Sequence, residues 1–202
     1  MKNIAITGQT GVGKTTIAWQ VMRGLNEVVN GKSSEICTIL DYDKIAKKCT
    51  AEDTNLKQEL LEIGIDSSNK NELSNIIFDP KNPLKKVAES LIHDSVFSYI
   101  DTHIKNFKNY KFLIHDIPLI PAAYERGLKF DKVYLIKSSD QIRLDRLVNS
   151  RYIDEKYAMI MIDNSIELSE YQKYSDIEFD SGDFQTQEIV NDIIENIRKN
   201  YG

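Results

Sequence analysis

The chain has 202 residues, of which 41% are hydrophobic and 28% are charged. This balance is typical of one globular domain and excludes a disordered chain. Its 26 Lys and Arg residues stand against 31 Asp and Glu residues, which gives a formal net charge of −5. An acidic chain without a basic block is a poor candidate for binding nucleic acid by phosphate neutralisation. A polyanionic small ligand remains compatible with this charge where cations converge locally.

The cysteines and the N-terminus indicate a reducing compartment. Cys37 and Cys49 are too few for a disulfide framework and lack zinc-type spacing, so we expect reduced thiols. No apolar run approaches the ~18 residues that span a bilayer, and the N-terminus lacks the apolar core of a signal peptide. We therefore expect a cytoplasmic protein that does not bind a membrane.

The first elements in chain order are a strand, a helix and a second strand. Asn3–Thr7 is a short β-type run, and a helix is expected from Lys14 to about Leu25 because its apolar residues recur at helical spacing. Gly31 and its polar neighbours break the chain, and Ile36–Leu40 is the next expected strand.

The middle of the chain, about residues 46–107, is expected to be mainly helical. Gly64–Asn71 is polar and loop-like, and Pro83 suits a helix start. A long amphipathic stripe then extends from Leu84 to Ile104. This block contains no strand-like run, so we interpret it as an insertion or lobe.

Three further strands complete the pattern. They are expected at Phe112–Ile114, which ends at His115 and Asp116, at Val133–Ile136, and at Asp176–Asp180. Helices are expected at Gln141–Val148 and at the C-terminal end. Alternation of strands and helices predicts an α/β fold with a parallel sheet covered on both faces. His115 alternates away from Asp116 and is expected to be structural.

The sharpest motif follows the first strand. Gly8-Gln9-Thr10-Gly11-Val12-Gly13-Lys14-Thr15 fits the pattern G-x-x-x-x-G-K-[ST] of a phosphate-binding loop. Its glycines let backbone N–H groups point at phosphate oxygens. Lys14 would reach the β- and γ-phosphates, and the Thr15 hydroxyl would ligate Mg²⁺. Thr16 either contacts the α-phosphate or is simply the next helical residue.

The class of phosphate-loop protein follows by elimination. None of the nine glycines has Asp three residues before it, which disfavours a GTPase, and Asp116 is followed by Ile117 where a motor-type ATPase usually has Glu. A small-molecule kinase remains. Asp41 and Asp43 follow the second strand, where one of them could take the proton of a hydroxyl acceptor. Both are equally well explained as helix-capping or solvated carboxylates.

The order of these segments resembles the dephospho-coenzyme A kinase family. The matching segments are Ile4–Thr16, Leu40–Ala46, Asn71–Phe78, Leu91–His93, Asp116–Leu119, Gly127–Leu128, Phe130–Val133 and Ser175–Gly182. The resemblance implies a single three-layer P-loop kinase domain over residues 1–202, with a five-stranded parallel sheet. It also implies a helical substrate-binding insertion at about 46–107 and an arginine-bearing lid at about 146–170.

The resemblance further implies ATP with Mg²⁺ and phosphorylation of the ribose 3′-hydroxyl of dephospho-coenzyme A. The catalytic residues would be Lys14, Asp43 as general base, Asp116 and Arg146. Nucleotide contacts would come from Gly8, Thr10, Gly11, Val12, Gly13, Lys14, Thr15, Thr16, Arg146, Arg151, Ser181 and Gly182. Substrate contacts would come from Asp41, Asp43, His93, Pro118 and Leu119, and Mg²⁺ contacts from Thr15 and Asp116. We expect a monomer with a small-molecule substrate.

Several positions depart from the family pattern and keep alternatives open. His93 is followed by Asp94 where the family has Pro, and the glutamine of the family's lid falls on Ser165. Arg143, Arg146 and Arg151 could also form an ordinary solvated helix face. A kinase for another acceptor, such as a nucleoside or nucleotide, therefore stays open, as does a nucleotide-binding protein with little turnover.

Overall fold

The computed structural model describes residues 1–26, 35–182 and 184–202. The predicted break at Gly31 lies outside these residues. The chain divides into two compact units, one made of residues 1–41 and 107–202 and the other of residues 42–106. Among the described residues, no helix is both long and apolar enough to pass through a bilayer.

The first unit is built on a five-stranded sheet, as predicted. The strands are β1 Lys2–Thr7, β2 Cys37–Asp41, β3 Phe112–Asp116, β4 Lys132–Lys137 and β5 Ile177–Asp180. Their order is β2-β3-β1-β4-β5, and every pair is parallel. The chain leaves β1 toward β2 and leaves β3 toward β4, so the adjacent ends of β1 and β3 form the switch point at which such sheets bind ligands.

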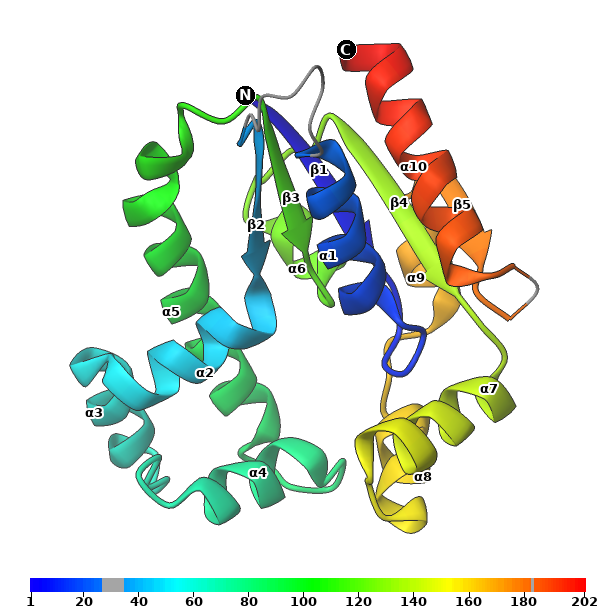
Figure 1. The fold of residues 1–202 in the computed structure, drawn as a ribbon. Helices are drawn as coiled ribbons and strands as arrows, with labels where there is room; N and C mark the ends of the chain where they lie inside the picture. Colours follow the sequence, from blue (N-terminus) through cyan, green and yellow to red (C-terminus); the bar gives the residue numbers. More distant parts are fainter. Residues whose placement is uncertain (27–34, 183) are drawn as a thin grey trace. The chain divides into compact units, whose positions relative to one another are not determined.

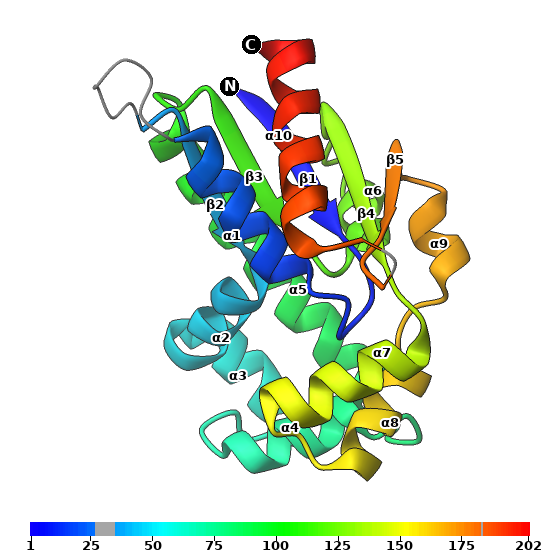
Figure 2. The ribbon, with the colours of Figure 1, turned by 45° about the vertical axis from the view of Figure 1, so that its right-hand side comes forward.

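Helices cover both faces of this sheet (Figure 1). α1 (Lys14–Leu25) and α10 (Thr186–Tyr201) pack together on one face, and α6 (Ile120–Glu125) and α9 (Leu168–Gln172) lie on the other. Figure 2 shows the same arrangement from a second side, with α10 in front of the strands. The three-layer α/β prediction is therefore confirmed.

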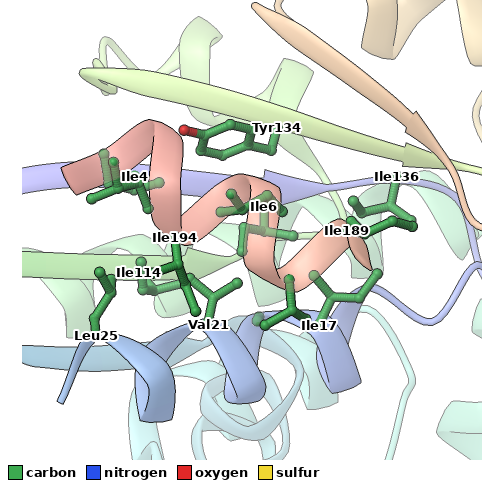
Figure 3. Packing of buried hydrophobic residues seen from close by; sticks show 14 of the residues in the cluster. Ile4, Ile6, Ile17, Val21, Leu25, Ile114, Tyr134, Ile136, Ile189 and Ile194 are labelled. Carbon is green, nitrogen blue, oxygen red and sulfur yellow. The ribbon is translucent and has the colours of Figure 1, made fainter. Parts of the chain in front are cut away.

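The core of this unit is aliphatic and lies between the strands and the helix pair (Figure 3). Ile4 and Ile6 of β1 and Ile114 of β3 meet Ile17 of α1 and Ile189 of α10, all 0 or 1% exposed. Strands that bury both faces need such continuous apolar runs. These contacts hold the ends of β1 and β3 in fixed register, with Ile6 opposite Asp116.

The clearest difference from the sequence prediction in the first unit lies between β4 and β5. The helix expected at Gln141–Val148 is instead α7 (Asp140–Asp145), followed by a π turn at Arg146–Ser150. α8 (Glu155–Asp163) comes next. A π turn holds one more residue than an α turn, and apolar periodicity does not reveal the extra residue.

The second unit is entirely helical, as the sequence predicts for this block. Its helices are α2 (Tyr42–Glu52), α3 (Thr54–Glu62), α4 (Lys70–Phe78) and α5 (Lys85–His103), and a 3-10 turn at Ile104–Phe107 follows. α2, α3 and α4 each pack against α5. α4 begins at Lys70, inside the predicted loop Gly64–Asn71, because Asn69 caps it by accepting a hydrogen bond from the Glu72 amide.

Candidate active site

The predicted phosphate loop, Gly8–Thr15, lies between the end of β1 and the start of α1. Gly13 directly precedes the helix with φ of +89°, a left-handed conformation that favours glycine. The helix therefore begins inside the loop. The backbone N–H groups of its first turn have no partners within the helix and suit an anion.

The remaining loop residues lie against the body of the first unit. Gly8, Gly11 and Val12 are buried, and Thr10 is half-buried. Two backbone carbonyls of the loop accept hydrogen bonds from arginines: that of Thr10 from Arg143 and that of Val12 from Arg146. Because these carbonyls accept hydrogen bonds on the outer side of the loop, the loop amides can point inward, toward a bound phosphate.

Lys14 forms a buried ion pair with Asp116. The Lys14 Nζ atom lies 2.9 Å from Asp116 Oδ1, and the two residues are 7% and 2% exposed. Asp116 is the last residue of β3 and sits opposite Ile6 of the adjacent β1. The strand register thus brings together two residues that are 102 positions apart. The neighbouring Thr15 is half-buried and Thr16 is exposed on the helix.

The surroundings of Asp116 resist its ionisation. Burial raises the pKa of the Asp116 carboxyl above its ordinary value, while the Lys14 ammonium and a hydrogen bond from the Thr15 hydroxyl act in the opposite direction. Asp41 adds to the increase. Loss of the Lys14 charge would leave two neighbouring carboxylates in a site that water hardly reaches.

Asp41 and Asp43 occupy different environments. Asp41 is the last residue of β2, is 9% exposed, and pairs in register with Asp116. Asp43 lies in the first turn of α2 and is exposed. The strand ends at Asp41 and the helix begins at Tyr42. Asp41 and Asp43 therefore belong to different elements and to different compact units.

Arg146, Val12 and Ser181 form a second cluster beside the loop. The Nη1 atom of Arg146 donates to the Val12 carbonyl at 2.9 Å and to Ser181 Oγ at 2.8 Å, and Nη2 donates to the Ser181 carbonyl at 2.7 Å. Ser181 Oγ also donates to the Val12 carbonyl at 2.8 Å. Three residues expected to contact the nucleotide are thus brought together, with exposed Gly182 next in the chain.

Arg151 follows the π turn and is exposed. In an α-helix the residue four positions after Arg146 lies nearly above it, but that residue is Ser150. A π turn has more residues per turn, so Arg151, five positions on, comes closer to that place.

The expected substrate residues are distributed over both units. His93 is half-buried on α5 in the second unit. Pro118 and Leu119 lie in the first unit between β3 and α6, and both are half-buried. The Pro118 carbonyl accepts a hydrogen bond from the Tyr171 hydroxyl at 2.9 Å.

One residue of the site was underestimated from the sequence. Arg143 was open to interpretation as a solvated arginine, but it is 1% exposed and donates to the phosphate loop. Its position three residues before Arg146 places both on one helical face, and this spacing is the signal that could have identified it.

Known proteins match this arrangement over almost the entire chain. The sequence model of the dephospho-CoA kinase family matches residues 2–185. A dephospho-CoA kinase of Lactococcus lactis is 24% identical over 206 residues, which cover 88% of this chain and 89% of that protein.

Solved structures share the fold. TT1252 from Thermus thermophilus superposes with a TM-score of 0.73 at 17% identity, covering 100% of this chain and 98% of that one. A dephospho-CoA kinase from Campylobacter jejuni gives 0.58 at 20% identity, with 98% of both chains covered. The matched range contains the phosphate loop, Asp116, Arg146 and Ser181. The chain belongs to the dephospho-CoA kinase family.

Proposed function

We propose that this protein transfers the γ-phosphoryl group of ATP to the ribose 3′-hydroxyl of dephospho-CoA, giving CoA and ADP. The observation that carries the proposal is the buried Lys14–Asp116 pair at the switch point of the sheet, in a chain of this family. A phosphate loop alone fits many nucleotide-binding proteins. A buried lysine and carboxylate beside it fit phosphoryl transfer.

The nucleotide side of the reaction is assigned to the first unit. The amides of Gly8–Thr16 hold the phosphates, and Lys14 contacts the β- and γ-phosphates. An ammonium has three donors, so the contact with Asp116 leaves donors for phosphate oxygens. Arg146 and Arg151 neutralise charge that develops on the transferred group, and Ser181 with Gly182 borders the adenine.

Mg²⁺ fits the residues beside the loop. Thr15 and Asp116 supply a hydroxyl and a carboxylate oxygen next to Lys14. Across the described ranges, no three or more His, Cys, Asp or Glu side chains gather into a metal site, which suits a cation that takes most ligands from phosphates and water. When bound, Mg²⁺ neutralises charge on the β- and γ-phosphate oxygens. Thr15 and Asp116 would hold it.

The acceptor side is assigned to Asp43 and its neighbours. Asp43 accepts the proton of the 3′-hydroxyl while the hydroxyl oxygen attacks the γ-phosphorus and the bond to the β-phosphate oxygen breaks. Asp41, His93, Pro118 and Leu119 contact the acceptor. We assign the insertion at about 46–107 to acceptor binding and the segment at about 146–170 to a lid that excludes water.

We further propose that the enzyme acts as a monomer in the cytoplasm. The two cysteines of the sequence are free and buried. Thiols in this state suit a reducing compartment.

The test is ADP release with ATP–Mg²⁺, measured with and without dephospho-CoA, followed by mass analysis of the acceptor. We expect the acceptor to gain one phosphoryl group only when protein, ATP and acceptor are all present. The K14M variant serves as the matched control for contaminating kinases. Protein that binds ATP but transfers nothing to dephospho-CoA would contradict the proposed acceptor. A panel of nucleosides and nucleotides, read by thermal stabilisation, would then identify the alternative.

A further inference from the structure

Arg143 is a buried cation of α7 that the proposed reaction does not use. Its guanidinium is only 2% exposed and donates in three directions. Nε donates to the Thr10 carbonyl at 2.8 Å, Nη1 to Asp140 Oδ1 at 2.6 Å, and Nη2 to Ser165 Oγ at 2.8 Å. Burial of a guanidinium is unfavourable unless its donors are satisfied. These partners come from the phosphate loop, the start of α7 and the segment after α8.

The backbone of Arg143 also supports the loop. Gly11, with φ of +86°, packs so closely that an added Cβ would lie 3.0 Å from the Arg143 carbonyl oxygen and 3.1 Å from its Cβ. The apex of the loop therefore rests on Arg143 through both backbone and side chain. A shift of α7 at this residue would displace the loop.

A second set of hydrogen bonds joins the phosphate loop to the end of the lid segment. Gln9 Nε2 donates to the Ile166 carbonyl at 2.9 Å and to Ser165 Oγ at 3.4 Å. Ser165 Oγ in turn donates to the Ile162 carbonyl, in the last turn of α8, at 2.6 Å. Ser165 is thus the point at which the lid helix, Arg143 and the loop meet.

We propose that Arg143 is a positioning residue that couples the phosphate loop to the base of the lid. It holds the Thr10 carbonyl on the outer side of the loop, so that the loop amides face the phosphates before nucleotide arrives. Through Ser165 it transmits order in the loop to residues 164–166. This inference rests on the proposed function only in that the loop binds ATP. It does not depend on the identity of the acceptor.

The variants that test it are R143M, R143K and S165A in the full chain. The affinity for ATP and ADP is measured by calorimetry, and KM is measured separately for ATP and for dephospho-CoA. We expect R143M to weaken nucleotide binding by roughly tenfold or more, the size typical of a lost charge-assisted hydrogen bond. KM for dephospho-CoA should stay unchanged. R143K should recover part of the affinity, because it keeps the charge and loses the planar fork.

Amide hydrogen exchange tests the coupling itself. In the unaltered protein, ADP should protect the amides of residues 9–14 and also those of 164–166. In R143M and in S165A the protection of residues 164–166 should be lost or reduced. The matched control is R198M, since Arg198 also donates to a backbone carbonyl, that of Gly24 at 3.0 Å, on α1 away from the phosphate loop. R198M should keep nucleotide affinity and both protections.

Each outcome decides for or against the coupling. R143M that binds ATP as tightly as the unaltered protein contradicts it, as does R143M that loses affinity for ATP and dephospho-CoA alike. If R143M does not fold, S165A removes a single hydroxyl, and unchanged protection of 164–166 in S165A overturns the coupling. Failure of the acceptor assignment would leave ADP binding and exchange intact, so the two failures are distinguishable.

Discussion

Asp116 and Asp43, the two carboxylates assigned to the two sides of the reaction, lie in opposite surroundings. Asp116 is 2% exposed at the end of a central strand, between Lys14 and Asp41. Asp43 is exposed in the first turn of a helix in the other unit. The phosphate side is therefore built in advance from buried, mutually dependent contacts, whereas the acceptor side presents a carboxylate to solvent. Substitutions should separate these two sides.

The largest effect is expected on the buried side, from K14M. The variant removes the cation assigned to the β- and γ-phosphates and leaves Asp116 buried without it, so kcat should fall by roughly 10³-fold. Steady-state ADP release measures it. K2M is the matched control, because Lys2 pairs with Asp131 at 2.8 Å on the surface. Exposed pairs contribute little, so K2M should retain full activity; equal losses in the two variants would contradict the assignment.

On the exposed side, D43N should lower kcat by roughly 10²-fold or more, a loss typical of a removed general base. The affinity for ATP should not change, since Asp43 belongs to the acceptor side. Turnover and ATP titration calorimetry measure the two quantities. E72Q alters another carboxylate in a first helical turn of the same unit and should leave both values unaltered. Unchanged turnover in D43N would refute its role as the base.

The dependence of stability on pH should also come from the buried side, through His115, the neighbour of Asp116. Burial lowers the pKa of His115 to about 3, well below the ordinary 6.5. The unfolded chain therefore binds this proton more readily between these values, and His115 should lower the free energy of unfolding by about 1.4 kcal/mol for each pH unit between about pH 6.5 and about pH 3. Urea unfolding at several pH values measures it. H115Q should flatten this dependence, and a slope identical to that of the unaltered protein would exclude His115 as its source.

The smallest effect is expected in the helical unit, from D53A. Asp53 caps α3 through the amides of Asn55 and Leu56 and accepts a hydrogen bond from Ser95 at 2.5 Å. Loss of such a cap costs about 1 kcal/mol, which should lower the melting temperature without altering ATP affinity. D154A removes the cap of α8 in the other unit and serves as the comparison. A weakened ATP affinity in D53A would show that the phosphate side and the acceptor side do not respond independently to substitution.

The parts of the molecule that were predictable from the sequence are those set by local rules. Apolar runs predicted the positions of the strands closely. For example, β3 was expected at Phe112–Ile114 with Asp116 at its end and is found at Phe112–Asp116. The spacing of the glycines predicted the phosphate loop. The resemblance to the family implied that Asp116 acts together with the loop, and the strand register, with Ile6 opposite Asp116, brings the two together.

The remaining features depend on partners far away in the chain. The buried state of Arg143 requires Thr10, 133 positions earlier, and Ser165, 22 positions later. Neither contact leaves a periodic trace. The π turn at Arg146–Ser150 was missed for a related reason, since one additional residue alters the geometry of a turn without altering its composition. The short helices α6 and α9 are too brief for a periodic pattern.

The last helix, α10, has a practical consequence for the design of truncated forms of this protein. The family match ends at residue 185, directly before α10, yet α10 contributes Ile189, Val190, Ile193 and Ile197 to the core that backs β1 and α1. A chain cut at the family boundary would expose that aliphatic surface to water and favour aggregation. The stretch that the family model matches is shorter than the stretch that builds this core, so a domain boundary does not belong at residue 185.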